Sequence, residues 1–379
     1  MSQRVDLSET AVLRPTVVEV SLAHLTENFR AIQAAVAPAA VMPIVKANAY
    51  GHGLVTVARH LVGLGAASLG VAFLEEAVAL REAGVTLPIL VMGGILGNQI
   101  PLFLRHGLTL TASSIDKLRQ IDETAREMGV TATVHLKIDT GMERTGVHYY
   151  NARGLLERAA GCRHVTVEGI YSHFANADAA DLGSARLQLA RFQDVIAWYD
   201  QQGIAPPVRH IANSGAILQL PESHLDMVRP GILLYGVYPS PEVRRTIAVH
   251  PALSWKSRVV YFKVVPPGHP VSYGSTWQTD HPVRVVTVPV GYGDGYFRAL
   301  SNVARVIIRG KKYPLVGRVC MDQIMVKIER ETAYNGDPVV LLGRDGDEAI
   351  TCEDLADWAG TIPYEVLTNI NTRVPRVYV

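Results

Sequence analysis

The sequence has little of what marks several large classes of protein. Its 379 residues include only three cysteines, Cys162, Cys320 and Cys352, which are odd in number and far apart. This is not a disulfide framework, and it favours a reducing, cytoplasmic location. Lys and Arg number 36 and Asp and Glu 35, for a formal net charge of +1. So balanced a charge gives no electrostatic reason to expect nucleic acid or an anionic membrane as a partner.

Long apolar runs are also missing. The longest, residues 61–74, is cut by glycines and is shorter than the roughly 20 residues that a membrane-spanning helix needs. Residues 1–15 contain no apolar segment typical of a signal peptide. Apolar residues still make up 48% of the chain and charged residues 19%, which excludes general disorder. The length then suggests two domains, and the sequence favours a soluble enzyme.

The first two-thirds of the chain alternates between two patterns. Continuous apolar runs predict strands that are buried on both faces, as in parallel sheets. They cover residues 41–45, 68–72, 88–92, 108–112, 133–138, 168–172, 208–212 and 226–233. Segments with helical periodicity lie between them, including residues 22–36, 74–84, 114–129 and 184–202. Eight such units over about 240 residues predict an α/β fold with an N-terminal (β/α)8 TIM barrel, and an open doubly wound sheet is the alternative.

The pattern changes near residue 250. Short predicted strands are separated there by turn signals such as Pro266-Pro267-Gly268, and one helix is expected near Cys352–Ala359, after a capping-box pattern at Thr351 and Asp354. We therefore divide the chain into a barrel, residues 1–248, and a C-terminal mostly β domain, residues 249–379. Whether residues 1–12 pack with the second domain is left open.

Polar residues follow several predicted barrel strands, at the face where such barrels place their reactive groups. Lys46 follows the first strand, His173 the sixth and Ser214 the seventh, and Arg229 lies in the eighth. Burial disfavours the charged form of a lysine and lowers its pKa, and a neutral amine can form a Schiff base with a carbonyl. A lysine that merely reaches from the barrel rim into solvent is the simpler interpretation of Lys46.

Nine segments in order resemble the alanine racemase family. They are Val45–Gly53, Lys137–Gly146, Tyr171–Asp178, Ala212–Ala216, Val228–Gly236, Val271–Trp277, Gly291–Tyr296, Val316–Asp322 and Pro363–Ile370. The resemblance spans nearly the whole chain. It departs from the family at Ser21 and Gly293, where many members have aspartate and alanine, and neither position carries catalysis in the family.

The resemblance implies a pyridoxal 5′-phosphate enzyme that interconverts L-alanine and D-alanine, supplies D-alanine for peptidoglycan, and forms a homodimer with shared active sites. It implies that Lys46 binds the cofactor and is the base for D-alanine, and that Tyr273, from the second subunit, is the base for L-alanine. Arg229 would face the pyridine nitrogen. Arg144 would bind the substrate carboxylate, and Lys137 is carbamylated in some family members. The other implied cofactor-binding residues are Tyr50, His173, Asn213, Ser214, Gly231, Ile232 and Tyr364, and the other implied substrate-binding residues are Met321 and Asp322.

Other functions stay open on the sequence alone. A racemase with a broader range, acting on serine as well as alanine, fits the same segments. A decarboxylase related in fold would place a carboxylate where Arg229 stands, and a non-catalytic pyridoxal-phosphate carrier would leave Tyr273 and the β domain unexplained. A metal-dependent barrel hydrolase would need a His-x-His pair, which the sequence lacks, so no metal is expected.

Overall fold

The computed structural model describes residues 14–379, which form two compact units. One unit is residues 22–250. The other combines the described residues up to Ser21 with residues 251–379. The described chain therefore starts in the second unit, continues through the whole of the first unit, and ends in the second unit. The open question of whether residues 1–12 pack with the second domain lies outside the described residues. The strand that follows them, β1 (Val17–Val20), pairs with strands of the second unit.

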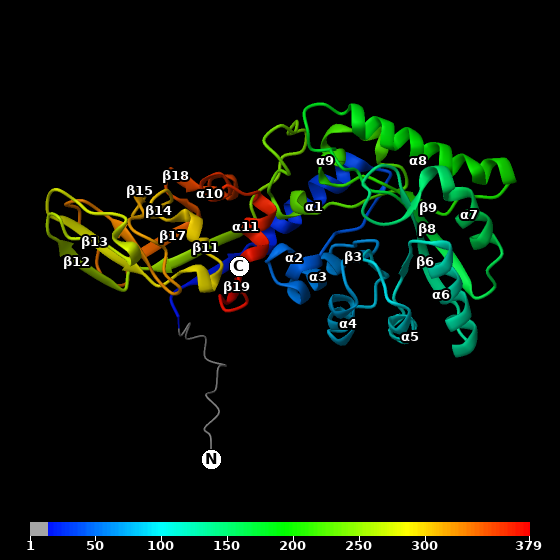
Figure 1. Ribbon diagram of the computed structural model, residues 1–379, viewed down its shortest axis with the longest axis horizontal. Coiled ribbons are helices and arrows are strands. Elements are labelled where there is room, and N and C mark those ends of the chain that lie inside the picture. Colours follow the sequence, from blue (N-terminus) through cyan, green and yellow to red (C-terminus); the bar gives the residue numbers. More distant parts are fainter. Residues whose placement is uncertain (1–13) are drawn as a thin grey trace, which may run out of the picture. The chain divides into compact units, whose positions relative to one another are not determined.

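The first unit is a closed barrel of parallel strands (Figure 1). The strands are β2 (Ala40–Val41), β3 (Leu69–Val71), β4 (Ile89–Val91), β5 (Leu110–Ala112), β6 (Ala132–Asp139), β8 (Val165–Tyr171), β9 (Val208–His210) and β10 (Met227–Val228). Regular ladders join β10 to β2, β3 to β4, and β5 through β6 and β8 to β9. Single bridges, Ile44 to Gly70 and Leu90 to Thr109, connect these ladders. The Arg229 N–H donates to the Ala212 carbonyl at 3.0 Å and closes the ring between β9 and β10. The predicted TIM barrel is confirmed.

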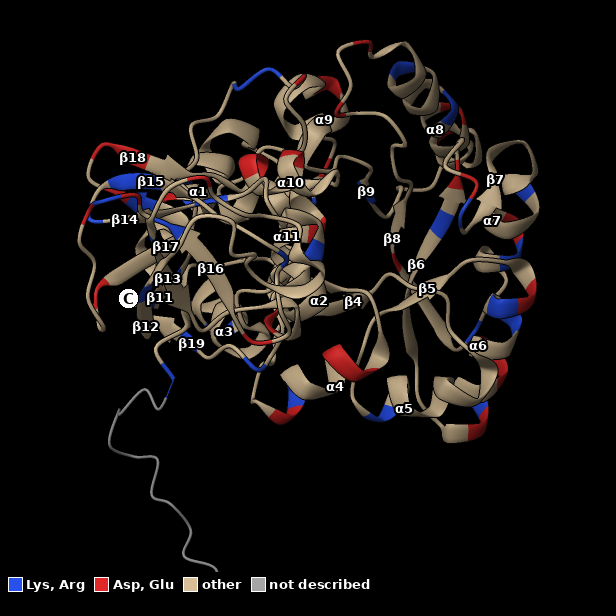
Figure 2. Ribbon diagram, turned by 60° about the vertical axis from the view of Figure 1, so that its left-hand side comes forward, with Lys and Arg blue, Asp and Glu red and all other residues tan. Residues whose placement is uncertain are grey.

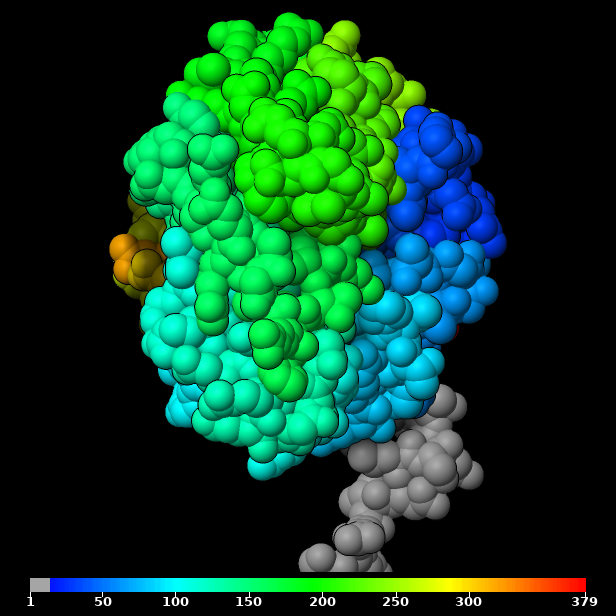
Figure 3. Space-filling view, turned by 90° about the vertical axis from the view of Figure 1, so that its right-hand side faces the viewer, coloured from blue at the N-terminus to red at the C-terminus, as the bar shows by residue number. Residues whose placement is uncertain are grey.

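Helices cover the outside of the barrel. They are α1 (Leu22–Val36), α3 (Leu54–Gly63), α4 (Leu74–Glu82), α5 (Ile100–Arg105), α6 (Ile115–Met128), α7 (Ala152–Ala160), α8 (Gly183–Gln202) and α9 (Ser214–Gln219). Consecutive helices from α5 to α8 pack side by side and form a closed outer layer (Figure 3). Both signs of charge are interspersed along α6 and α7 (Figure 2), as expected for solvated helix faces in a chain of almost no net charge.

Each predicted barrel strand overlaps an observed one, but the eighth was predicted too long. The sequence pattern extended it over residues 226–233, whereas β10 ends at Val228. Pro230 and Gly231 then break the strand, and residues Ile232–Tyr235 form a short 3-10 helix, η4. Tyr235 and its neighbours in η4 are buried, so their apolar character reflects burial rather than strand structure.

The second unit is rich in β structure. A seven-stranded sheet contains β15 (Lys311–Pro314), β14 (Arg305–Ile308), β17 (Pro338–Asp345), β11 (Leu253–Arg258), β1, β19 (Arg376–Tyr378) and, paired to β17, β18 (Glu348–Ile350). A three-stranded sheet contains β12 (Tyr261–Val265), β13 (Val283–Val288) and β16 (Ile324–Lys327). The helices are α10 (Cys352–Ala359) and α11 (Pro363–Asn369). The capping box at α10 is present, because Thr351 Oγ1 accepts from the Asp354 N–H at 3.1 Å and the Asp354 carboxylate accepts from the Thr351 N–H at 2.8 Å.

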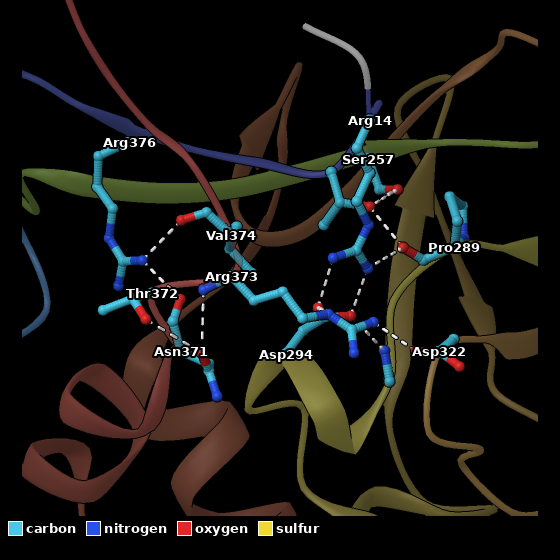
Figure 4. Close-up of polar contacts among 12 residues, drawn as sticks. Arg14, Ser257, Pro289, Asp294, Asp322, Asn371, Thr372, Arg373, Val374 and Arg376 are labelled. Carbon is cyan, nitrogen blue, oxygen red and sulfur yellow. Dashed lines mark hydrogen bonds and ion pairs between the residues drawn. The ribbon is translucent and has the colours of Figure 1, made fainter. Parts of the chain in front are cut away.

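A buried carboxylate joins distant segments of this second unit (Figure 4). Asp294 is fully buried, and its two oxygens accept from the Arg14 guanidinium, each at 2.5 Å. Arg373 Nε lies 3.0 Å from the same carboxylate, and the Arg373 guanidinium also binds Asp322. The Gly291 N–H adds a further donor to Asp294 at 3.0 Å. The start of the described chain, the loop after β13 and the segment before β19 thus meet at one side chain.

We expect Asp294→Ala to lower the free energy of unfolding by about 2–3 kcal/mol, because it removes a buried acceptor but leaves two arginines that still reach water. The matched control is Asp322→Asn, which changes an exposed partner of Arg373 and should cost under about 1 kcal/mol. Urea denaturation of the three proteins measures both values. Equal stability of the two variants would contradict the role given to Asp294.

None of the helices formed by residues 14–379 has the length and apolar character that crossing a bilayer requires.

Candidate active site

Most of the predicted cofactor residues lie in the barrel unit, at the carboxyl ends of its strands. Lys46 follows β2, His173 follows β8, Asn213 and Ser214 follow β9, and Arg229 follows β10. Tyr50, Arg144, Gly231 and Ile232 lie in the loops and short helices at the same ends, and Lys137 lies inside β6. The parallel barrel brings these residues together because all its strands point the same way.

Lys46 is followed by a left-handed turn. Residues Lys46–Tyr50 form the short element α2, in which Ala47, Asn48, Ala49 and Tyr50 all have φ between +51° and +55°. Residues other than glycine rarely adopt this conformation, and each such residue costs roughly 1–2 kcal/mol. Four in succession must be held by surrounding contacts, and strain of this kind is typical of functional sites.

The environment of Lys46 favours a neutral amine. Burial lowers its pKa below the ordinary lysine value, and the positive charges of Arg144 and Arg229 lower it further. Glu76 acts in the opposite direction. A lysine whose pKa is depressed can serve as a nucleophile or a base closer to neutral pH than a surface lysine can.

Arg229 is buried and rigidly held. Its NH2 group donates to the carbonyls of Ser172 at 2.7 Å and Ile211 at 3.1 Å, and to His173 Nδ1 at 3.2 Å. Its NH1 group donates to His210 Nδ1 at 2.8 Å. Burial lowers the pKa of Arg229 to about 10, so the guanidinium stays charged at neutral pH. Because arginine only donates, the facing Nδ1 atoms of both histidines must be unprotonated.

Arg229 is the inner end of a chain of hydrogen bonds that crosses the barrel. His210 Nδ1 accepts from Arg229, so the proton of His210 is on Nε2 and is donated to His135 Nδ1 at 2.8 Å. The proton of His135 is then on Nε2, which donates to the Glu168 carboxylate at 3.2 Å. His135 lies directly over Gly169, where an added Cβ would be 2.5 Å from the imidazole. The buried arginine is thereby connected to a carboxylate near the barrel surface.

A second cluster suits a phosphate group. Ser214 Oγ accepts from the N–H groups of Gly231 at 3.0 Å and Leu233 at 3.3 Å, which leaves its own hydrogen to donate elsewhere. A Cβ at Gly231 would lie 2.5 Å from the Tyr50 hydroxyl and 3.8 Å from Ser214 Oγ, so only glycine allows these groups to approach so closely. Burial raises the pKa of Tyr50, which therefore remains a hydroxyl donor. Loops after the seventh and eighth strands are the usual phosphate site of this fold.

The other predicted residues of the barrel unit have less specific surroundings. Asn213 caps α9, since its side chain accepts from the Ala216 N–H at 3.1 Å, and Ile232 is buried at the start of η4. Lys137 is buried, with its Nζ 4.6 Å from the Tyr171 ring centroid, and burial lowers its pKa far below the ordinary value. The loop that carries Arg144 is fixed by its backbone N–H, which donates to Asp139 at 3.2 Å.

Four predicted site residues belong to the second unit. Tyr273 lies in a short 3-10 turn, η5 (Tyr273–Ser275), and is 70% exposed. Met321 is also exposed, and Asp322 is bound by Arg373 as described above. Tyr364 lies in the first turn of α11. Their place beside Lys46 therefore stays a prediction.

Comparison with known proteins shows to which family the chain belongs. The family described as "Alanine racemase, N-terminal domain" matches residues 20–239, and "Alanine racemase, C-terminal domain" matches residues 252–378. The chain belongs to the alanine racemase family. A relative named alanine racemase, from Carboxydothermus hydrogenoformans, is 46% identical over 369 residues, which cover 97% of this chain and 100% of that protein.

Solved structures agree with this assignment. The alanine racemase of Streptomyces lavendulae is 39% identical, with a TM-score of 0.92 and 97% of each chain covered. A histidine racemase from Leuconostoc mesenteroides is 29% identical, with a TM-score of 0.89, and the match covers 97% of this chain and 99% of that one. Racemases that are named for different amino acids thus share the fold found here.

Sequence reasoning missed two parts of this site. His135 and Glu168 were not predicted to matter, because a partner 75 residues away cannot be inferred from a single histidine in a strand. Glu76 was also missed, although a glutamate at the third position of a helix is a known capping signal. Neither a single histidine in a strand nor a capping glutamate indicates, from sequence alone, that the residue contacts a functional side chain.

Proposed function

We propose that this protein is an alanine racemase that uses pyridoxal 5′-phosphate to interconvert L-alanine and D-alanine. The observation that carries the proposal is the partly buried amine of Lys46, with a lowered pKa, in the segment that follows a barrel strand in a chain of this family. A lowered pKa leaves more of the amine in the neutral form that attaches to an aldehyde, and the donors around Ser214 and Tyr50 suit a phosphate. The residues present therefore fit this cofactor.

Within this proposal, the bound cofactor supplies an electron sink for the charge that remains when alanine loses its Cα proton. Lys46, once neutral, removes or returns that proton on one face of the substrate. Tyr273 does so on the other face, so that a proton lost from one side is replaced from the opposite side. Arg144 binds the substrate carboxylate through its guanidinium fork. Ser214, Gly231, Ile232, Tyr50 and Tyr364 would hold the phosphate, and Asn213 and His173 would orient the site.

Arg229 has a separate task in the proposal. A residue that only donates would leave the pyridine nitrogen of a bound cofactor unprotonated, whereas a carboxylate in its place would keep that nitrogen protonated. A bound cofactor in that state would supply a weaker electron sink, which would favour racemisation over transamination and decarboxylation. The hydrogen bonds to His210 and His173 hold the guanidinium in place.

We therefore expect Arg229→Glu to raise transamination per racemisation event by at least about tenfold, a change of about 1.4 kcal/mol in partitioning. Arg229→Lys is the control, since it keeps the positive charge and should leave partitioning near the wild-type value. Pyruvate released during turnover of L-alanine, measured against D-alanine formed, gives the ratio for each protein. Equal ratios in the two variants would argue against this role of Arg229.

Lys137 is a further part of the proposal. Its lowered pKa leaves more of the amine neutral, which is the form that reacts with carbon dioxide to give a carbamate. A carbamate there would place a negative charge within the influence of Arg144 and Arg229, both of which lower the Lys137 pKa. The proposal also includes a cytoplasmic homodimer with shared sites that supplies D-alanine for peptidoglycan.

Chiral chromatography of alanine tests the function directly. The protein, loaded with pyridoxal 5′-phosphate, is incubated with L-alanine and separately with D-alanine, and both reactions should reach equal amounts of the two enantiomers. L-serine and L-histidine, run in parallel, distinguish a strict alanine racemase from one with a broader range, a necessary test because a histidine racemase shares the fold. Unchanged alanine would refute the proposal, and release of ethylamine would favour a decarboxylase.

A further inference from the structure

The left-handed turn after Lys46 is held from outside by one carboxylate. The Ala47 N–H donates to Glu76 Oε1 at 2.6 Å. Glu76 Oε2 accepts from the N–H groups of Ala72 at 2.9 Å and Phe73 at 3.2 Å. Glu76 is in the first turn of α4, so its side chain joins the end of β3 and the start of α4 to the residue next to Lys46.

A carboxylate is the group that this position requires. All three bonds to Glu76 come from N–H donors, and an ionised carboxylate has acceptor oxygens on both sides. A glutamine would offer one accepting oxygen, and its NH2 group would face an N–H donor on the other side. From the middle of the turn, Asn48 Oδ1 accepts from the Leu54 N–H at 2.9 Å. The bonds at Ala47 and Asn48 therefore both support a conformation that is unfavourable in itself.

We propose that Glu76 is a positioning residue for Lys46: its carboxylate holds the turn that aims the lysine side chain and supplies a negative charge that acts on the amine. The inference rests on the proposed function only in assigning catalysis to Lys46. Four charged or titratable groups interact electrostatically with this amine: Arg144 after β6, His173 after β8, Arg229 after β10 and Glu76 in α4. Glu76 opposes the lowering of the Lys46 pKa that burial and the two arginines cause.

The test compares Glu76→Gln with Glu75→Gln, using the full-length protein. Glu75 precedes Glu76 in the same turn of α4 and is exposed, so its variant removes the same charge without touching the Ala47 N–H. Hydrogen exchange, followed by mass spectrometry of peptides that span residues 46–54, reports on the turn with and without cofactor. We expect exchange of the Ala47 amide to be at least about ten times faster in Glu76→Gln and unchanged in Glu75→Gln.

Two further measurements separate positioning from plain structural support. The first is the pH dependence of Lys46 acetylation in the cofactor-free protein. The second is the acidic limb of kcat/KM for L-alanine in the loaded enzyme. Loss of the Glu76 charge destabilises the Lys46 ammonium, so the neutral amine should persist to lower pH and both curves should shift to lower pH. The kcat value should fall more than KM changes, because the base is misaligned while the binding groups are kept.

Each outcome decides the proposal. Faster Ala47 exchange together with shifted pH curves supports it. Unchanged exchange would show that the contact does not hold the turn, and faster exchange with unshifted curves and normal kcat would show structural support alone. Either result overturns the assignment. If the wild-type protein fails to racemise alanine, the proposed function falls, yet exchange and acetylation still decide whether Glu76 positions Lys46.

Discussion

Lys46→Ala is expected to lower kcat/KM for alanine racemisation by at least about 10⁴-fold, because one substitution removes both the covalent attachment point and one of the two bases. Folding should be little affected, since the lost side chain carries a partly buried amine with a lowered pKa rather than a stabilising ion pair. Chiral chromatography at saturating cofactor measures the loss, and circular dichroism checks the fold.

Lys46→Arg is the matched variant for this prediction. It puts a permanently charged guanidinium at the same position, which cannot act as a base near neutral pH, so it should be as inactive as the alanine variant. Added ethylamine should restore part of the activity of Lys46→Ala, because the shortened side chain leaves room for it. It should restore no activity to Lys46→Arg. Retention of more than about a tenth of the activity in either variant would remove Lys46 from the mechanism.

A mixture of two inactive variants is expected to recover about a quarter of wild-type activity. In the proposed homodimer, Lys46 of one subunit faces Tyr273 of the other. Lys46→Ala and Tyr273→Phe chains, mixed at random, give about half mixed dimers, and each mixed dimer has one site with both residues intact and one with neither. Co-expression with two affinity tags isolates the mixed dimer, which should reach about half of wild-type activity.

The matched control is the chain with both substitutions, mixed with wild-type chain. In a shared site, every site of that mixed dimer lacks one residue, so the purified mixed dimer should be inactive. If both residues acted within one chain, this control dimer would retain about half of the activity and the first mixed dimer would show none. The two purified dimers therefore give opposite results under the two arrangements.

The barrel could be predicted because its strands leave a simple signal. Strands buried on both faces are continuous apolar runs, and helices between them repeat with a different period. The eighth strand was overextended because residues 232–235 are equally apolar in a 3-10 helix. The membership of β1 in the second unit was not predictable, because its partners β11 and β19 lie more than 230 residues away in the chain.

Apart from the family resemblance, the sequence predicted the site only as a group of polar residues at the ends of barrel strands. Lys46, His173, Ser214 and Arg229 were predicted as site residues because a barrel collects such ends on one face, and the structure places each of them after a strand. The left-handed turn was not foreseen, since Ala47 to Tyr50 contain no glycine and local preferences favour a right-handed helix. It exists because of tertiary contacts, above all the Glu76 carboxylate, and such contacts cannot be inferred from local sequence.

The measurement that tests the central claim most directly is the location of the cofactor. The protein is loaded with pyridoxal 5′-phosphate, reduced with borohydride, digested and analysed by mass spectrometry. The account predicts one pyridoxyl group per chain, on the peptide that contains Lys46, and little label when the loaded protein is Lys46→Ala. Label on Lys137 or any other lysine of wild-type protein, or none at all, would contradict the account.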